Sequence, residues 1–301
     1  MKIIEYNNFK IRPLAGAMGA EILDVDLKNI NDDTFNEIYK AFVDYQVIGI
    51  LDQDLNSDQY LEFGRKWGEI HHYPYMKGLE THPEILEIVK TEKDTYAFGN
   101  VWHSDGSFTE IPPKATMLYA QELPPAGGDT LFANMYQAYD TLSDQMKEIL
   151  GSLRGFTLVI NPKLGNFTGA KSMKQQDPGK TKVHTYHPII RTHPDSKNKA
   201  LYIGGHAVEI EGMTKEESTP ILNYLKSHST RPEFICRLKW SPGTIAIWDN
   251  RCTQHYAVDD YAGFRRRMHR ITIIGEEAPY FEGRNNIKNE KCDGSPEQWG
   301  P

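Results

Sequence analysis

The chain has 301 residues and a mass of 34.4 kDa, which is enough for one large domain or two small ones. Its composition, with 39% hydrophobic and 25% charged residues, is that of a globular protein and excludes a disordered or low-complexity chain. The formal net charge of −7 argues against broad electrostatic binding to nucleic acid or anionic lipid, so we expect no nucleic-acid partner.

The N-terminal segment and the cysteines indicate a location. The first residues, MKIIEYNNFKIRPL, have neither the apolar run nor the small-residue cleavage site of a secretory signal. No run of about 18 apolar residues predicts a transmembrane helix. The cysteines Cys236, Cys252 and Cys292 are too few and too scattered for a disulfide framework. We therefore expect a cytoplasmic protein with no membrane partner.

Two helices and one strand are predicted in the first hundred residues. Apolar side chains recur on one helical face of Asp33–Tyr45, and Asn31 or Asp32 can cap this helix. Val47–Leu51 is a short apolar run that is typical of a buried strand. Ser57 can cap a second helix that carries further apolar residues.

From residue 115 onward the pattern changes to short apolar segments separated by Pro and Gly clusters. The predicted strands are Ala115–Ala120, Asp129–Ala133, Lys199–Ile203, Phe234–Trp240, Thr244–Trp248 and Met268–Gly275. One more helix is predicted at Lys215–Lys226, where Thr214 and Glu217 form a capping box. Pro220 lies inside this helix and indicates an irregularity.

Many short strands and few helices favour a mainly β fold with flanking helices, closed as a sandwich or jelly roll. A parallel α/β sheet would need helices that alternate with strands, and this pattern is absent from the sequence. No linker divides the chain, so we treat 1–301 as a single domain. The polar, unpatterned stretch at about 161–182 is predicted as an insertion, either a mobile lid or a plain surface loop.

Three residues form a candidate metal site. His103 and Asp105 lie two apart in an extended segment, so their side chains point to the same side. His255 follows an apolar strand and can lie at its end. Two histidines and one carboxylate on one face of an octahedron are typical of non-haem Fe(II) oxygenases. The competing zinc motif, a C-x-x-H formed by Cys252 and His255, lacks a second half-site.

An arginine cluster follows this site in the sequence. Arg266 and Arg270 share one face of the predicted strand, whereas Arg265 and Arg267 lie on the other face, where we expect them to be solvated. Each guanidinium on the first face can bind a carboxylate or sulfonate through paired hydrogen bonds. The residues alone therefore predict a metal site beside an anion site, in an enzyme or in a non-redox binding module.

Four motifs of the chain occur together in a known family. They are WHSD (Trp102–Asp105), GGDT (Gly127–Thr130), IWDNRCTQH (Ile247–His255) and RRRMHR (Arg265–Arg270). With them the chain resembles the taurine dioxygenase family of Fe(II)- and 2-oxoglutarate-dependent oxygenases, which includes the 2,4-dichlorophenoxyacetate dioxygenases. The likeness covers nearly the whole chain, from about Arg12 to Pro279.

The resemblance implies a double-stranded β-helix, that is, a jelly roll, and an enzyme that uses Fe(II), 2-oxoglutarate and O2. His103, Asp105 and His255 match the iron ligands, which form the catalytic centre of the family. Arg266 and Thr130 match the residues that bind the distal carboxylate of 2-oxoglutarate. The implied reaction hydroxylates a small organic anion and releases succinate and CO2. The resemblance also implies a homo-oligomer, either a dimer or a tetramer.

The candidate substrate contacts depart from the taurine pattern in several places. Arg270 matches the arginine that binds the taurine sulfonate, but Tyr73 stands where the family has a histidine. The family asparagine before the metal motif falls at Gly99, beside Asn100, and a hydrophobic residue after the metal aspartate is here Gly106.

Four segments leave the substrate class undecided between two branches of the family. GNVWHSDGSF and LYIGGHA resemble the aryloxyalkanoate branch, whereas QHY and RRRMHR resemble the taurine branch. His206, in LYIGGHA, either reaches the substrate or is a structural histidine in a turn. We expect a taurine- or alkylsulfonate-like substrate, with an aryloxyalkanoate as the alternative and a non-redox metal-binding jelly roll as the remoter one.

Overall fold

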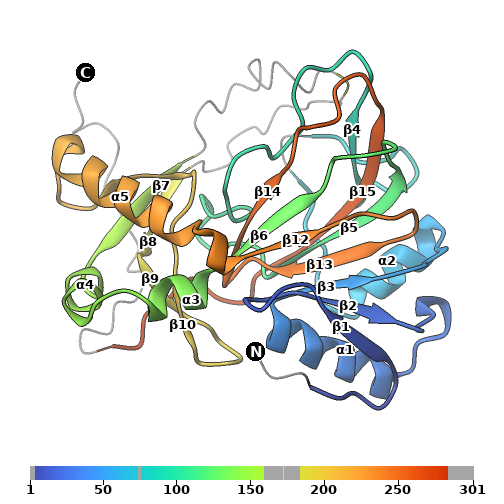
Figure 1. Cartoon of the computed structure of the whole chain (residues 1–301), viewed down its shortest axis with the longest axis horizontal. Helices are drawn as coiled ribbons and strands as arrows, with labels where there is room; N and C mark the ends of the chain where they lie inside the picture. The colour runs from blue at the N-terminus through green and yellow to red at the C-terminus, as the bar shows by residue number, and fades with distance from the viewer. Residues whose placement is uncertain (1–3, 74–75, 159–171, 173–183, 284–301) are drawn as a thin grey trace.

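The computed structural model describes residues 4–73, 76–158, 172 and 184–283. Two β-sheets form the centre of the molecule, with two helices beside the larger sheet and three more gathered at the other end (Figure 1). The described part of the chain is therefore mainly β with flanking helices, as the spacing of short apolar segments predicts.

The larger sheet has seven strands in the order β1-β2-β3-β13-β5-β15-β4. Its strands are β1 (Lys10–Pro13), β2 (Ala20–Leu23), β3 (Val47–Ile50), β4 (Leu86–Lys90), β5 (Ala115–Glu122), β13 (Ile245–Asp249) and β15 (Arg266–Ile273). All neighbours pair antiparallel except β2 and β3, which run parallel. This sheet brings β13 and β15, which carry two of the motifs, to either side of β5.

The smaller sheet faces the larger one. It consists of β12 (Ile235–Leu238), β6 (Thr130–Asn134) and β14 (Thr253–Ala257), in that order. A buried cluster joins the two sheets: Phe132 and Leu238 from the smaller sheet pack with Leu118, Trp248 and Met268 from the larger one. Two facing sheets with a shared apolar core form the predicted jelly roll.

Two helices cover the outer face of the larger sheet. α1 (Asp32–Tyr45) and α2 (Ser57–Arg65) bury apolar side chains against it, in a core that includes Phe42 and Trp67. Asn31 caps α1, as predicted. The prediction that Ser57 caps α2 is wrong, because Asn56 accepts the capping hydrogen bond from the backbone of Gln59 and Ser57 is the first helical residue.

A second core lies at the other end of the molecule. Its helices are α3 (Met135–Asp140), α4 (Asp144–Leu150) and α5 (Lys215–Ser229). Its strands are β7 (Arg154–Leu158), β8 (His184–Pro188), β9 (Ile190–Thr192), β10 (Lys199–Leu201) and β11 (Ala207–Ile210). None of these strands except β10 is predicted from the sequence.

For helix α5 the predicted capping box is confirmed, whereas the predicted irregularity at Pro220 is wrong. The capping box of Thr214 and Glu217 is present. Pro220 does not interrupt the helix, which continues to Ser229. Pro220 lies near the start of the helix on an exposed surface. Proline has no backbone N–H, so one carbonyl group of the preceding turn receives no helical hydrogen bond, but water can bind it there.

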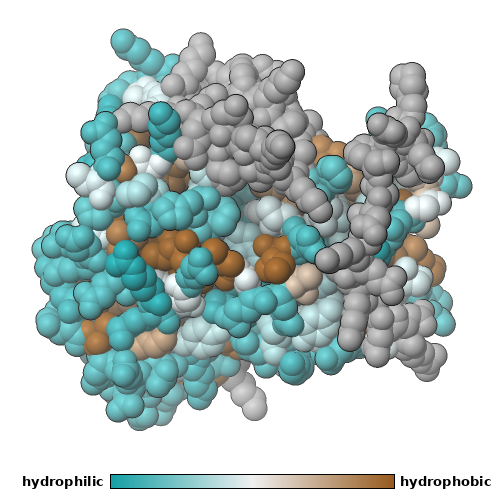
Figure 2. Space-filling model, turned by 180° about the vertical axis from the view of Figure 1, so that it is seen from behind, coloured by the Kyte–Doolittle hydropathy of each residue, from teal (hydrophilic) through white to brown (hydrophobic). Residues whose placement is uncertain are grey.

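The insertion predicted at 161–182 lies outside the described residues, apart from Ser172. In the part of the chain that is described, no helix is long and apolar enough to span a bilayer. Figure 2 shows the face opposite to that of Figure 1, where hydrophilic side chains predominate and smaller hydrophobic patches lie between them.

Candidate metal centre and anion site

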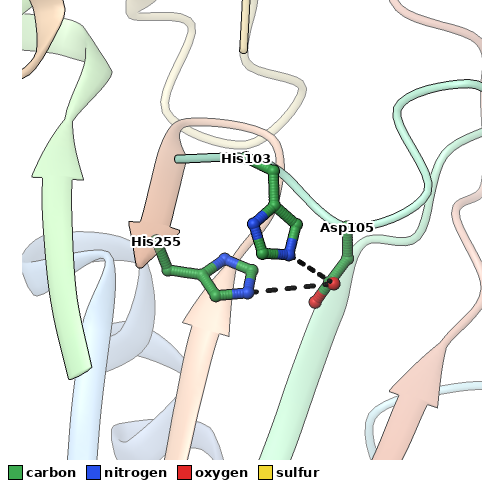
Figure 3. A group of neighbouring side chains, drawn as sticks. All are labelled: His103, Asp105 and His255. Carbon is green, nitrogen blue, oxygen red and sulfur yellow. Dashed lines mark ion pairs between the residues drawn. The ribbon is translucent and has the colours of Figure 1, made fainter. Parts of the chain in front are cut away.

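The three predicted metal ligands come together because the WHSD segment runs beside β14. His103 and His255 exchange two backbone hydrogen bonds, from the amide of His103 to the carbonyl of His255 at 3.1 Å and in return at 2.8 Å. The pairing places the two imidazoles next to one another, with ring centroids 4.2 Å apart. Asp105, two residues further along, points toward both rings (Figure 3).

The geometry of these side chains suits a metal ion. One ligand atom from each residue lies within 4.8 Å of the others. The Nε2 atoms of His103 and His255 lie 3.6 Å and 3.8 Å from Oδ1 of Asp105, too far for hydrogen bonds. Nδ1 of His103 lies 2.7 Å from the carbonyl oxygen of Val101, which fixes the proton there and leaves the Nε2 lone pair free for a metal.

Electrostatics favours the charge states that a metal needs. Burial alone would raise the pKa of Asp105, but the guanidinium of Arg270, whose Nη2 lies 2.9 Å from Oδ1, and the two imidazoles hold the pKa well below its ordinary value. Burial, together with the nearby His103, lowers the pKa of His255 well below its ordinary value. The site therefore offers a carboxylate and a neutral imidazole, which are the forms that bind metal ions.

Polar residues behind the site hold Asp105 in place. Thr116 donates a hydrogen bond to Oδ2 of Asp105 at 2.7 Å. Asn250 accepts one from the Asp105 backbone amide at 3.3 Å and donates to the Thr116 hydroxyl at 2.9 Å. The sequence reasoning missed both supporting residues, although Asn250 lies in the IWDNRCTQH motif and could have been found as its buried polar residue.

A single cavity joins the metal ligands to the predicted anion site. Thr130, Arg266 and Arg270 line it together with His103, Asp105 and His255. Its other described lining residues are Gly99 and a largely apolar set that the sequence reasoning did not select, namely Ile88, Phe98, Leu118, Trp248 and Ala257. β-Strand parity explains why Arg266 and Arg270 point inward, whereas Arg265 and Arg267 pair with surface glutamates.

Arg266 has an unusual environment for a charged side chain. It is only 7% exposed, and burial lowers its pKa. The guanidinium lies 5.5 Å from the ring of Trp240, whose Nε1 donates to the Thr130 hydroxyl at 3.0 Å. Among the described residues no carboxylate forms an ion pair with Arg266, and its Nε has no hydrogen-bond partner. A buried guanidinium in this state is suited to an anionic ligand.

The predicted substrate residues fall into two groups. Arg270 and Gly99 line the cavity, and the ring of Tyr73 lies 5.6 Å from the Arg270 guanidinium. Asn100 lies next to Gly99 and accepts a hydrogen bond from the Tyr256 hydroxyl at 3.4 Å.

The remaining two substrate candidates have other neighbours. Gly106 has φ +59°, and a side chain there would lie 2.5 Å from Cδ of Pro113, so its position requires glycine for packing. His206 binds the Ser107 hydroxyl through Nδ1 at 2.8 Å and lies 5.9 Å from the His103 ring, but it does not line the described cavity.

A second buried cluster contains residues that could also hold a metal, namely His193, Asp249 and Cys252. Here the Asp249 carboxylate binds the guanidinium of Arg251 through both oxygens, at 2.8 Å and 2.7 Å. Cys252 thus belongs to this cluster and not to that of His255, so the structure does not form the C-x-x-H zinc site.

A jelly roll whose cavity is lined by two histidines, an aspartate and an arginine without an acidic partner among the described residues defines a metal-dependent oxygenase that uses an anionic cosubstrate. The chain belongs to the taurine catabolism dioxygenase TauD, TfdA family, whose model matches residues 10–272.

Known proteins of this kind resemble the chain over most of its length. A sulfate ester dioxygenase from Pseudomonas putida that depends on alpha-ketoglutarate (2-oxoglutarate) is 33% identical over 278 residues, which cover 88% of this chain and 89% of the relative. The crystal structure of a taurine dioxygenase from Burkholderia xenovorans is 29% identical, with a TM-score of 0.78, and covers 94% of this chain and 97% of its own. The structure of AAD-2 with Mn(II) and N-oxalylglycine is 28% identical, with a TM-score of 0.74, over 90% and 98% of the two chains.

The protein is therefore an Fe(II)- and 2-oxoglutarate-dependent dioxygenase that uses O2. This confirms the predicted jelly roll, the predicted enzyme class and the predicted cofactors, and it disfavours a non-redox binding module. The residues present fit these groups, because His103 offers a metal-binding tautomer and Arg266 has an unpartnered, buried Nε atom.

Proposed function

We propose that His103, Asp105 and His255 bind Fe(II), and that Arg266 and Thr130 bind the distal carboxylate of 2-oxoglutarate. The observation that carries this proposal is the buried Arg266 guanidinium, which opens into the same cavity as the three ligands and has no described acidic partner. Keeping such a charge away from water without a partner is costly, and an anionic cosubstrate offsets that cost.

When bound, Fe(II) supplies the activation of O2 that couples decarboxylation of 2-oxoglutarate to hydroxylation of the substrate. The side chains of this protein prepare the site for that chemistry. The Val101 carbonyl fixes the tautomer of His103, and Thr116 orients the carboxylate of Asp105. The three ligands are less than 10% exposed, so the fold keeps bulk water away from them.

We further propose that the substrate is an organosulfur anion with an apolar remainder, either an alkyl sulfate ester or an alkylsulfonate. Arg270 offers a guanidinium beside the metal ligands, and its Nε atom has no partner among the described residues. The described wall of the cavity is largely apolar, with Ile88, Phe98 and Leu118. These features suit an anionic head and an alkyl or aryl tail.

The charge of the cavity argues against taurine itself as the preferred substrate. Taurine carries an ammonium group, which needs a carboxylate or several acceptors when it leaves water. Asp105 is the single acidic residue among the described lining residues, and Arg270 already pairs with it. The similarity to the Pseudomonas sulfate ester dioxygenase supports the same choice of substrate class.

The proposed products follow from where the hydroxyl group is placed. Hydroxylation of the carbon bonded to the ester oxygen of an alkyl sulfate gives an unstable intermediate that breaks into an aldehyde and sulfate. Hydroxylation of the carbon bonded to the sulfur of an alkylsulfonate gives an aldehyde and sulfite. In each turnover one oxygen atom of O2 enters the substrate as the hydroxyl group and the other enters succinate, which forms with CO2 from 2-oxoglutarate.

The test is succinate formation by the Fe(II)-loaded protein with 2-oxoglutarate, O2 and one of four substrates: hexyl sulfate, hexanesulfonate, taurine or phenoxyacetate. We expect the fastest turnover with hexyl sulfate or hexanesulfonate, with one sulfate or sulfite released per succinate. Taurine as the best substrate would refute the argument from charge, and phenoxyacetate as the best would favour the aryloxyalkanoate alternative. Full activity in His103→Ala would contradict the ligand assignment.

The remaining predictions concern the state of the protein in the cell. We propose a single-domain homo-oligomer in the cytoplasm, supported by the family resemblance and the composition of the chain. The dimeric or tetrameric state can be measured by sedimentation of the intact protein.

A further inference from the structure

Tyr261 lies directly behind the proposed carboxylate clamp. Its hydroxyl lies close enough to the Arg266 guanidinium for the two groups to interact electrostatically, although the ring is not part of the described cavity wall. Tyr261 is 4% exposed, and burial raises its pKa to about 12. The hydroxyl is thus a neutral acceptor at physiological pH, which leaves the charge of Arg266 available for a ligand.

The Arg266 side chain needs such support. Arginine has many rotamers, and here no described ion pair restricts them. Gly128 has φ +73°, and a side chain at this position would lie 3.2 Å from Cδ of Arg266 and 3.3 Å from Cδ1 of Tyr261. The backbone of the GGDT motif therefore lies close to both side chains, and glycine at this position lets Arg266 and Tyr261 pack side by side.

Tyr261 is itself held from its other side. The ammonium group of Lys90 lies 4.5 Å from the centre of the Tyr261 ring, within the range of a cation–π interaction. Lys90 is 4% exposed and pairs with Asp259 at 3.8 Å. It also stands directly opposite Arg266 in the pairing of β4 with β15. Tyr261 thus lies between two buried cations, with its ring against one and its hydroxyl against the other.

The loop that carries Tyr261 is fixed by its two preceding residues. Asp259 accepts a hydrogen bond from the backbone amide of Ala97 at 2.9 Å. Asp260 accepts one from the amide of Gly128 at 2.7 Å. The loop is therefore tied to the segment before the WHSD motif and to the GGDT motif at once, so that the position of Tyr261 is set by both.

We propose that Tyr261 is a positioning residue for the cosubstrate: it fixes the Arg266 guanidinium in the orientation that receives the distal carboxylate of 2-oxoglutarate. The inference rests on the proposed role of Arg266 as the clamp. Tyr261 acts through Arg266, so its contribution concerns the distal carboxylate and leaves the metal end of the cosubstrate unaffected.

The test compares two ligands that differ at one end. 2-Oxopentanoate has the same 2-oxo acid as 2-oxoglutarate but carries a methyl group in place of the distal carboxylate. Calorimetric titration of the Mn(II)-loaded protein, which avoids turnover, measures the affinity for each. In Tyr261→Phe we expect the affinity for 2-oxoglutarate to fall about tenfold, as for the loss of one polar contact to a charged group, with an unchanged affinity for 2-oxopentanoate.

Two variants make the result decisive. Tyr136→Phe is the matched control, because the Tyr136 hydroxyl is also buried but binds Ser196 in the second core, and it should change neither affinity. Arg266→Gln should abolish the preference for 2-oxoglutarate over 2-oxopentanoate. A preference that survives in Arg266→Gln contradicts the proposed clamp and the inference with it.

Two other outcomes would overturn the inference about Tyr261 but leave the proposed role of Arg266 intact. If Arg266→Gln loses the preference and Tyr261→Phe keeps it, Arg266 is the clamp and Tyr261 does not position it. Equal weakening of both ligands in Tyr261→Phe would likewise overturn the inference, since it would show a general structural role. Steady-state kinetics give a second readout, in which we expect a raised KM for 2-oxoglutarate with an unchanged kcat.

Discussion

Two buried clusters of this protein each contain a histidine, an aspartate and an arginine, yet they have opposite properties. One joins His103, Asp105 and His255 to Arg270, and the other joins His193, Asp249 and Cys252 to Arg251. Both hold a carboxylate whose pKa lies well below its ordinary value, although burial alone would raise it.

The difference lies in how many polar atoms have a partner. In the second cluster Nε2 of His193 lies 2.9 Å from Asp249, and Nδ1 accepts from two backbone amides, of Asp195 and Ser196. In the first cluster the Nε2 atoms of His103 and His255 stay more than 3.5 Å from the Asp105 carboxylate. A cluster in which the polar atoms are hydrogen-bonded to one another stabilises the fold. A cluster in which histidine nitrogens point to a common place without hydrogen-bond partners is suited to bind a metal.

The largest expected effect on stability is in the second cluster. Asp249→Asn removes the buried charge that pairs with both Arg251 and His193 and leaves Arg251 its ion pair with Asp195, and we expect it to lower the free energy of unfolding by about 3–5 kcal/mol at pH 7. Urea unfolding measures this loss. Asp24→Asn is the control, because Asp24 forms an exposed ion pair with Lys10 whose loss should cost less than about 1 kcal/mol. Equal effects of the two substitutions would contradict the structural role of Asp249.

The same substitution in both clusters tests the comparison most directly. His193→Gln removes the bond to Asp249 and leaves backbone amides without their acceptor, so we expect a loss of about 3 kcal/mol of stability with unchanged Mn(II) binding. His103→Gln should abolish Mn(II) binding and succinate formation, with a stability change of about 1 kcal/mol or less. Thermal unfolding and calorimetric metal titration measure both. Metal binding that depends on His193 would contradict the comparison.

Asn250 links the two clusters in the sequence but supports the first one. We expect Asn250→Ala to weaken Mn(II) binding about 10- to 100-fold, because Asp105 and Thr116 lose the partner that orients them. Asn134→Ala is the control: this buried asparagine caps α3 and binds the Ala17 carbonyl, away from the metal centre. We expect Asn134→Ala to lower the stability of the protein and to leave its affinity for Mn(II) unchanged. Weakened Mn(II) binding in Asn134→Ala would show that the effect is not specific to Asn250.

The IWDNRCTQH motif shows how much of the site the sequence can predict. Two histidines and a carboxylate are a known ligand set, which predicts His255 as a ligand, and strand parity correctly places Arg266 and Arg270 on the inner face. Asp249 binds both Arg251 and His193, and His193 lies more than fifty residues earlier in the chain, so no local pattern joins the three. The sequence therefore indicated which residue types carry the chemistry, but not which of them stabilise the fold.

The prediction of the fold has the same limit, because local sequence patterns identify buried strands but not the pairing of distant segments. Within the two facing sheets, β3, β5 and β13 are largely apolar and buried, and the pattern of apolar residues finds them. Strands of the second core, such as β7 and β8, carry polar residues on partly exposed faces and pair only with one another and β11. Their pairing depends on contacts between distant segments, which the local sequence does not contain.

The smallest expected effect is the pH dependence of the Asp249 contribution. The folded-state pKa of Asp249 lies far below its ordinary value of 3.8, so its stabilisation is complete above about pH 4 and is lost as the pH falls further. The difference in unfolding free energy between the wild type and Asp249→Asn should therefore shrink below pH 4, by at most about 1.4 kcal/mol per pH unit.

Urea unfolding between pH 7 and pH 2.5 measures this difference. Other carboxylates with lowered pKa values, such as Asp94, are present in both proteins and cancel in the comparison. A difference that stays constant down to pH 2.5 would show that Asp249 acts through packing. A difference that shrinks on acidification shows that its negative charge, bound between Arg251 and His193, is what stabilises this end of the molecule.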